Sequence, residues 1–258
     1  MFTYALFALF ACETAPETVD EPTAEYEDSD DIPTPSDDLE DDEEDVNGGS
    51  DDNSDEETEP LPSGPSTWLF SQDESLLYLQ VWRDSSAWGS SLAHDHVIRA
   101  GVWEGTLSYD TDDLSACAMT ISLAVSELVV DEDGMRSLVG YSDTISSSDR
   151  DEIRENMLSS DQLDASRHPD IWFESVSCAG DTGDSGSLTV TGDLSARGQT
   201  SRVQIPLDFE IRGDAFYVVG DFSLSHDDFG MEPYEAYWGA VRNDDELGFA
   251  FDMVGALQ

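Results

Sequence analysis

Three histidines are the side chains of this sequence best suited to chemistry. His94 and His96 flank Asp95. In a strand, side chains two positions apart point to the same face, where two imidazoles can bind one metal ion. His226 lies far along the chain and is the candidate for a third ligand. The same side chains would also serve as structural hydrogen-bonding groups, so the sequence leaves a metal site and a structural role both open.

Two cysteines and the missing motifs bear on the class of protein. Cys117 and Cys178 lie in strand-like segments, and in an exported protein we expect them to form a disulfide. The alternative is a pair of buried free thiols.

The sequence contains no G-x-S-x-G nucleophile motif and no Gly-rich nucleotide-binding loop. We therefore expect a protein that is not an enzyme and has no cofactor.

The N-terminal residues predict export and lipidation. Residues 2–11 form an apolar run that is too short to span a bilayer but typical of a signal peptide, which we place at residues 1–11. The Leu9-Phe10-Ala11-Cys12 segment resembles a bacterial lipobox, which implies acylation of Cys12 and a membrane anchor made of more than one acyl chain. We expect the cell envelope as the location. Because Glu13, and not the Asp that commonly retains lipoproteins at the inner membrane, follows Cys12, we expect the anchor in the outer membrane.

Charge divides the chain into two parts. The formal net charge is −49, all ten cations are Arg, and residues 13–64 carry acidic side chains but no Lys or Arg. Such a segment buries too little apolar surface to fold, so residues 12–64 are expected to be a disordered acidic linker. This charge argues against nucleic acid as a partner, because binding there depends on cations facing phosphates. The remaining part, residues 65–258, is long enough for one domain with its own core.

From residue 67 onward the hydrophobic pattern alternates with period two, which predicts antiparallel strands. Turn residues such as Gly, Asp and Asn bound many of these segments. One helix is expected from residue 148 to about 160, with Ser148 as its N-cap and Asp151 completing a capping box. About eight strands and one short helix favour a closed barrel, which leaves no exposed sheet edge. The strand candidates are 76–82, 102–109, 116–125, 171–176, 187–194, 203–211, 215–224 and 247–254.

Three segments together resemble the YceI-like family of polyisoprenoid-binding proteins. They are Arg154–Leu158 continuing through Arg167-His168-Pro169-Asp170-Ile171-Trp172-Phe173-Glu174-Ser175, then Leu188–Thr200, and then Ser225-His226-Asp227-Asp228-Phe229-Gly230-Met231. The resemblance covers about residues 67–258. It implies an exported lipocalin-like antiparallel barrel whose interior holds an isoprenoid or a similar long apolar chain. The segment around His94 and His96 also resembles a part of the family's barrel, which adds contact with a polar lipid headgroup to the roles left open for these histidines.

Large aromatic side chains are the candidates for the walls of such a binding site. Burying a prenyl chain against them is favoured by about 25 cal/mol per Å² of apolar surface. The alternative is that they fill a solid core, in which case the domain would serve as an interaction module of the cell envelope. The sequence leaves the oligomeric state undetermined. The candidates are Trp82, Trp103, Trp172, Phe173, Phe209, Phe222 and Trp238.

Overall fold

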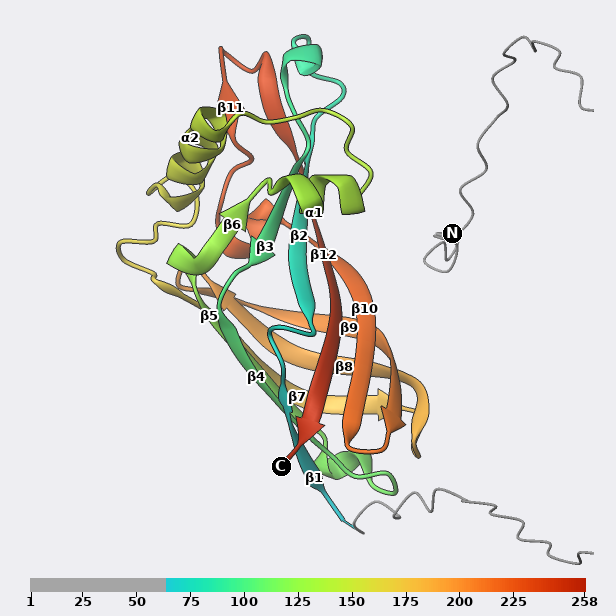
Figure 1. The fold of residues 1–258 in the computed structure, drawn as a ribbon. Coiled ribbons are helices and arrows are strands. Elements are labelled where there is room, and N and C mark those ends of the chain that lie inside the picture. Colours follow the sequence, from blue (N-terminus) through green and yellow to red (C-terminus); the bar gives the residue numbers. More distant parts are fainter. Residues whose placement is uncertain (1–63) are drawn as a thin grey trace, which may run out of the picture. The chain divides into compact units, whose positions relative to one another are not determined.

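The computed structural model describes residues 64–258, and most of this part is antiparallel strand (Figure 1). The strands are β1 (Ser66–Phe70), β2 (Leu76–Arg83), β3 (His96–Ala100), β4 (Trp103–Tyr109), β5 (Ala118–Ala124), β6 (Leu128–Val130), β7 (Asp170–Gly180), β8 (Ser185–Ala196), β9 (Gln199–Arg212), β10 (Ala215–Ser225), β11 (Glu235–Ala236) and β12 (Val241–Leu257). The helices are α1 (Asp133–Leu138) and α2 (Ser147–Leu158), with short 3-10 turns η1 (Ser90–Leu92), η2 (Leu114–Ala116), η3 (Val125–Glu127) and η4 (His226–Phe229).

The strands close into a barrel. Around the ring the order is β1, β4, β5, β7, β8, β9, β10 and β12, and the ring closes because β12 also pairs with β1. Trp68 of β1 lies opposite Leu257 of β12 at this closing pair. The predicted antiparallel barrel of about eight strands is therefore confirmed.

Four further strands, β2, β3, β6 and β11, lie outside the closed ring and extend one side of it. β12 is long enough to pair with β1 near its C-terminal end and with β2 along its preceding part, where Asp252 lies opposite Leu76 and Leu247 opposite Val81. β3 and then β6 continue from β2, and β11 pairs with the start of β12. The upper part of the barrel in Figure 1 is thus walled by strands outside the closed ring.

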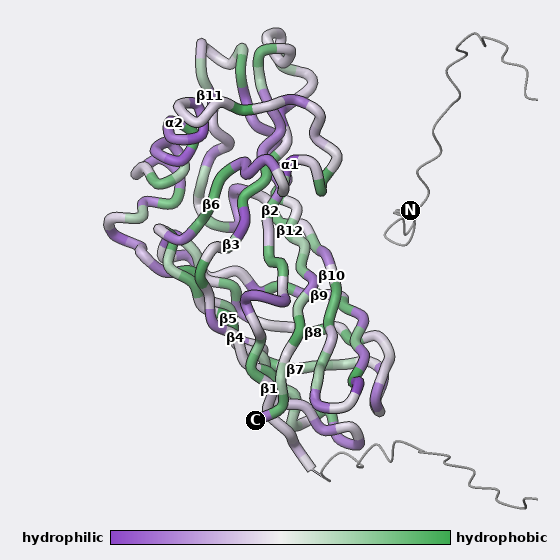
Figure 2. The backbone as a smooth tube through the Cα atoms, viewed as in Figure 1, coloured by the Kyte–Doolittle hydropathy of each residue, from purple (hydrophilic) through white to green (hydrophobic). Residues whose placement is uncertain are grey.

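The period-two pattern of the sequence separates the side chains that face the inside of the barrel from those that face the outside. In β9 the apolar side chains at Val203, Ile205, Leu207, Phe209 and Ile211 are buried, and the residues between them are mostly exposed. Alternate side chains of a strand point to opposite faces, so one face of β9 lines the interior. Figure 2 shows hydrophobic residues along the strands and a largely hydrophilic α2.

The helices differ from expectation in two respects. The N-cap of α2 is Ser146, which accepts a hydrogen bond from the backbone N–H of Asp149, so the predicted cap at Ser148 was wrong. Several adjacent serines can cap a helix, and the backbone is already extended at Ser146. The second helix, α1, was not expected, because its sequence has little apolar periodicity and its position depends on the buried Arg136.

The N-terminal predictions fall outside the part of the chain that the structure describes. This applies to the signal peptide at 1–11, to Cys12, and to the acidic linker apart from Gly64. Within residues 64–258, neither helix has the length and apolar content needed to cross a bilayer.

Candidate functional site

The barrel contains an apolar cavity of about 200 Å³. Its walls come from the inward face of the strands and from residues of α2 and η4. None of the residues that line it is Asp, Glu, Lys or Arg. The lining residues are Leu77, Tyr78, Leu79, Val81, Ile98, Ala100, Met119, Ile121, Leu123, Leu128, Met157, Gln162, Leu163, Ile171, Trp172, Phe173, Val190, Leu194, Ala196, Ile205, Leu207, Phe222, His226, Phe229, Met231, Leu247, Phe249, Phe251 and Met253.

Aromatic rings fill the barrel near the C-terminal end of β12. Tyr109 packs edge-to-face against Phe209 and Phe216, with ring centroids 5.2 and 5.5 Å apart, and Trp68 packs edge-to-face on Phe216 at 5.2 Å. The Tyr109 hydroxyl donates to the carbonyl of Gly183 at 3.0 Å. Burial, together with nearby carboxylates, raises the pKa of Tyr109 to about 12. The cavity therefore ends at this plug, because it is lined by the preceding part of β12 and not by these rings.

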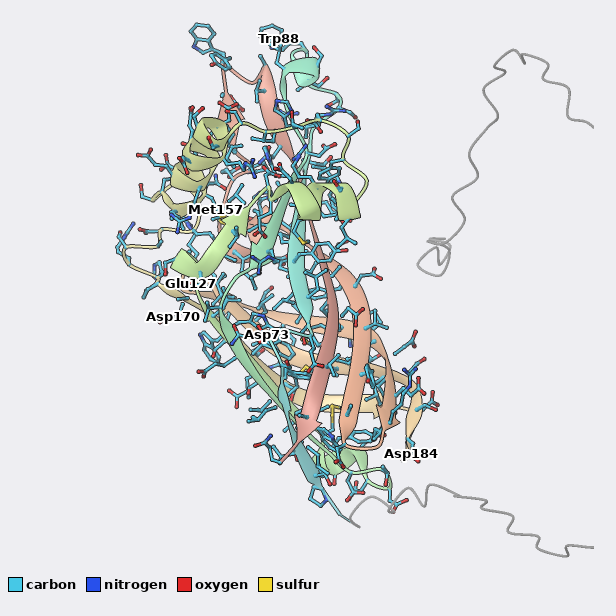
Figure 3. The ribbon with its side chains drawn as sticks, in the orientation of Figure 1. Asp73, Trp88, Glu127, Met157, Asp170 and Asp184 are labelled. Atoms are coloured by element: carbon cyan, nitrogen blue, oxygen red, sulfur yellow. A yellow bond between two sulfur atoms is a disulfide. The ribbon has the colours of Figure 1, made fainter. Side chains whose placement is uncertain are left out.

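The other end of the cavity is bordered by α2, the segment after it and η4. Met157 and Leu163 are only partly buried there, whereas Phe229 is 3% exposed. Arg197 connects the two borders, because its guanidinium donates to the carbonyl oxygens of Gly230 and Ser160. Figure 3 shows Met157 on the α2 side of the barrel, away from Asp184 at the opposite end. We define these borders, residues 157–163 and 226–231, as the mouth.

Three of the seven predicted wall residues line the cavity. Phe173 is buried, Phe222 stacks on Phe249 with ring centroids 4.8 Å apart, and Trp172 is 45% exposed. Only these three are placed at the cavity.

The other four do not line it, each for a physical reason. Trp82 points to the outer face, since its neighbour Val81 lines the interior, and its ring covers Gly248. Trp103 is buried but is not among the lining residues, and its ring packs 6.4 Å from that of Phe70. Phe209 belongs to the aromatic plug. Trp238 is 96% exposed in the turn between β11 and β12.

His94 and His96 join one network of side chains through two different carboxylates. His94 Nδ1 lies 2.6 Å from Asp143 Oδ2, and His96 Nδ1 lies 2.7 Å from Asp131 Oδ2. The buried guanidinium of Arg136 bridges the two carboxylates, at 2.7 Å to Asp131 Oδ1 and 2.5 Å to Asp143 Oδ1. Between residues 64 and 258 the structure brings together no group of three His, Cys, Asp or Glu side chains that could hold a metal. The observed geometry is that of a structural network.

Asp131 is the centre of this network. Its side chain is fully buried, which opposes ionisation, but hydrogen bonds from His96, the Val97 backbone N–H and Arg136 outweigh burial and hold the pKa of Asp131 below its ordinary value. Asp131 also adopts a left-handed backbone conformation with φ of 50°. The network therefore fixes α1 and the start of the following segment to β3.

His226 lies apart from that network. It is 3% exposed, lines the cavity, and donates from Nδ1 to the carbonyl oxygen of Asp245 at 2.9 Å. It does not join His94 and His96 in a common site. Its place at the mouth makes it, with Gln162, one of the few polar groups beside the cavity.

Cys117 and Cys178 are joined by a disulfide in the structure, with Cα atoms 6.0 Å apart. Cys117 precedes β5 and Cys178 lies in β7, the strand that pairs with β5. The bond therefore ties together two neighbouring strands of the wall.

Sequence reasoning missed most of the cavity wall. Leu77, Leu79 and Ile121 line the interior, but the wall candidates predicted from the sequence were all aromatic residues. The alternation was visible, since Leu77, Leu79 and Val81 occupy every second position of one strand. The ion pair of Asp131 with Arg136 carried no sequence signal, because both lie outside any strand that the pattern predicts.

Residues 86–254 match the family model described as the YceI-like domain. Among solved structures, BcnA of Burkholderia cenocepacia is similar, with 15% identity, 72% of this chain and 98% of that chain covered, and a TM-score of 0.52. A polyisoprenoid binding domain from Saccharophagus degradans, implicated in plant cell wall breakdown, has 9% identity, 76% and 100% of the two chains covered, and a TM-score of 0.50. At these identities the structural likeness concerns the fold. Comparison with curated protein sequences gives no match.

Proposed function

This chain belongs to the YceI-like family, and from that premise we propose that its barrel binds the hydrocarbon chain of an isoprenoid lipid, without catalysing a reaction. The observation that carries the proposal is the apolar cavity of about 200 Å³ between the aromatic plug and the mouth. An apolar cavity excludes water and accepts apolar molecules. Its elongated wall, from Met253 to Leu247 along β12, suits one chain of carbons.

The lining favours a lipid whose polar end is uncharged. No Arg is among the lining residues, and residues 65–258 carry a formal charge of −26. A phosphate at the mouth would be repelled by this charge, and the guanidinium of Arg197 beside the mouth is already bonded to the carbonyl oxygens of Gly230 and Ser160. Gln162 and His226 offer hydrogen-bonding groups there, which suits an alcohol or carbonyl oxygen. We therefore propose a neutral isoprenoid over a prenyl phosphate.

Val190 provides a direct test, because its side chain is 1% exposed and lines the cavity. Val190→Phe places a larger side chain in the cavity. Val219→Phe is the matched control, since Val219 is 40% exposed on the outer face of β10. Both proteins are purified from membranes, extracted with organic solvent, and the lipid is identified by mass spectrometry, with circular dichroism to check folding.

We expect a stoichiometric neutral isoprenoid in the wild type and in Val219→Phe, and at least a tenfold lower content in Val190→Phe, because the added ring occupies the space of about one isoprene unit. Wild-type protein that is repeatedly free of lipid would contradict the proposal. An extract that contains a prenyl phosphate would contradict the proposed neutral polar end of the lipid. It would still support binding of an apolar chain by the barrel.

We also propose that Cys12 carries the lipid anchor and places the domain in the cell envelope. This rests on the apolar run at residues 2–11 and on the lipobox-like residues before Cys12. The test is metabolic labelling with a fatty acid. The label should be lost in Cys12→Ser and its membrane retention should fall, and an unlabelled wild type would reject the anchor.

A further inference from the structure

Two loops at one end of the molecule expose large apolar side chains. They comprise residues 85–93, between β2 and β3, and residues 236–241, between β11 and β12. We call them together the aromatic tip. Single exposed apolar residues are common on proteins, but four in two adjoining loops are not. The exposed side chains are Trp88 at 79%, Leu92 at 71%, Tyr237 at 72% and Trp238 at 96%.

The two loops are held together as one surface. The backbone N–H of Gly89 donates to the carbonyl oxygen of Ala240 at 3.0 Å. A Cβ at Gly89 would lie 2.7 Å from that oxygen, so only glycine allows this approach. At the base of the tip Arg242 forms an ion pair with Asp84. Figure 3 shows Trp88 at the end of the molecule opposite Asp184.

The turn that carries Trp238 has a strained backbone. Tyr237 and Trp238 have φ angles of 51° and 57°, in the left-handed region that bulky side chains rarely adopt. The loop is closed by the antiparallel pairing of Ala236 with Val241 and of Glu235 with Arg242. Asn and Gly would make such a turn without this strain. Backbone strain of this kind persists only where the surrounding structure holds it, and it is concentrated at functional sites.

The tip also lacks charge. Residues 85–93 and 236–241 contain no Asp, Glu, Lys or Arg, in a chain whose net charge is −49. A charged protein surface would find no complementary group here. Trp and Tyr, by contrast, favour the boundary between lipid headgroups and acyl chains, where a ring can be apolar at one end and hydrated at the other.

We propose that the aromatic tip inserts into the headgroup region of a zwitterionic lipid bilayer. The acidic remainder of the domain disfavours anionic membranes, so the uncharged tip is the surface that can approach lipid. β2 and β12 lead into the tip, and their residues Val81 and Leu247 line the cavity. Docking through the tip brings this end of the barrel towards lipid. The inference goes beyond the proposed function and holds equally for an empty barrel.

The test uses the full chain with Cys12→Ser, so that no acyl group contributes to membrane binding. Flotation with phosphatidylcholine vesicles measures the partition coefficient. Trp88→Ala with Trp238→Ala should lower it about tenfold or more, because the apolar area removed from water is lost. Leu92→Ala should lower it less, and its matched control Leu138→Ala, at a residue that is 52% exposed on α1, should leave it unchanged.

A second variant separates docking from folding. Tyr237→Asn with Trp238→Gly relieves the backbone strain, so the melting temperature should rise while vesicle binding falls. In the Cys12→Ser chain, brominated phosphatidylcholine should quench part of the tryptophan fluorescence, and this quenching should be weaker in the variant, which keeps only Trp88 of the two tip tryptophans.

Three results would overturn the proposal. The first is vesicle binding that the tip variants leave intact. The second is no binding of the Cys12→Ser chain to phosphatidylcholine vesicles, or binding only when phosphatidylserine is added. The third is concentration-dependent self-association in sedimentation that Trp238→Ala abolishes, which would identify a second copy of the chain as the occupant of the tip.

Discussion

Removal of the proposed lipid should lower the thermal stability of the barrel. An unfilled cavity costs roughly 24 cal/mol per Å³ in engineered protein cores. For the observed cavity of about 200 Å³, this gives about 5 kcal/mol as the most that a filling chain can restore. The chain must itself be ordered on binding, so the net gain is smaller. For a domain of this size each kcal/mol shifts the melting temperature by roughly 2–4 °C, and we expect the lipid-free protein to melt about 5–15 °C lower.

Scanning calorimetry can measure this difference on one preparation. The protein is unfolded, extracted with solvent, and refolded with its disulfide intact, with or without a neutral isoprenoid alcohol. The increase in melting temperature should depend on the concentration of free ligand, because the ligand binds the folded state and shifts the unfolding equilibrium. Val190→Phe fills part of the cavity from within, so its gain on adding the alcohol should be much smaller than that of Val219→Phe.

Two calorimetric results would refute this reasoning. One is an equal melting temperature for the lipid-free and loaded wild type. The other is an equal gain for Val190→Phe and Val219→Phe, which would mean that the ligand binds outside the cavity. A straight-chain alcohol with the same number of carbons serves as a comparison, and an equal effect would remove the preference for an isoprenoid.

Three further predictions concern the groups that hold the barrel together. Arg136→Met leaves the buried Asp131 carboxylate without its guanidinium and should cost about 3–5 kcal/mol in urea unfolding, whereas the exposed Arg212→Met should cost less than about 1 kcal/mol; equal costs would contradict the assigned role. Reduction of the Cys117–Cys178 disulfide, which spans 61 residues, should lower the free energy of unfolding by about 4 kcal/mol, so an unchanged urea midpoint would rule out this contribution. Since the pKa of Tyr109 is raised to about 12 in the folded barrel, stability from its protonated form is present below the ordinary value near 10 and should decline as pH rises from about 10 to 12. The decline should be smaller in Tyr109→Phe, where only Tyr78 and Tyr141, whose pKa values are also raised, still contribute.

The barrel could be predicted from sequence because its signal is local and repeated. Every long strand carries apolar residues at alternate positions, as in Val203, Ile205 and Leu207, and a period of two leaves little choice of structure. The short strands were missed for the same reason. β6 has three residues, Leu128–Val130, which is too few to show a period. β1 was missed although Trp68 is almost fully buried, because its five residues show only two alternations.

The site was harder to predict, since residue type does not reveal direction. Trp82 and Trp172 both sit in predicted strands, yet one faces outward and the other borders the cavity. Which residues face inward depends on register, and register depends on partners far along the chain. Trp238 shows a second limit, because an apolar residue in a turn has no alternating neighbours that would show it to be exposed.

Closure of the barrel depends on residues that lie almost a whole domain apart in sequence. β1 and β12 pair at Trp68 and Leu257, and Gln258 donates from its backbone N–H to the carbonyl of Thr67. This seam cannot form until β12 is free to pair with β1, and contacts between distant residues form slowly. Until then the inner faces of β7–β10 stay open to water and to other nascent chains, and such exposed surface favours aggregation. The time before β12 pairs with β1 is therefore when the chain is most prone to aggregation.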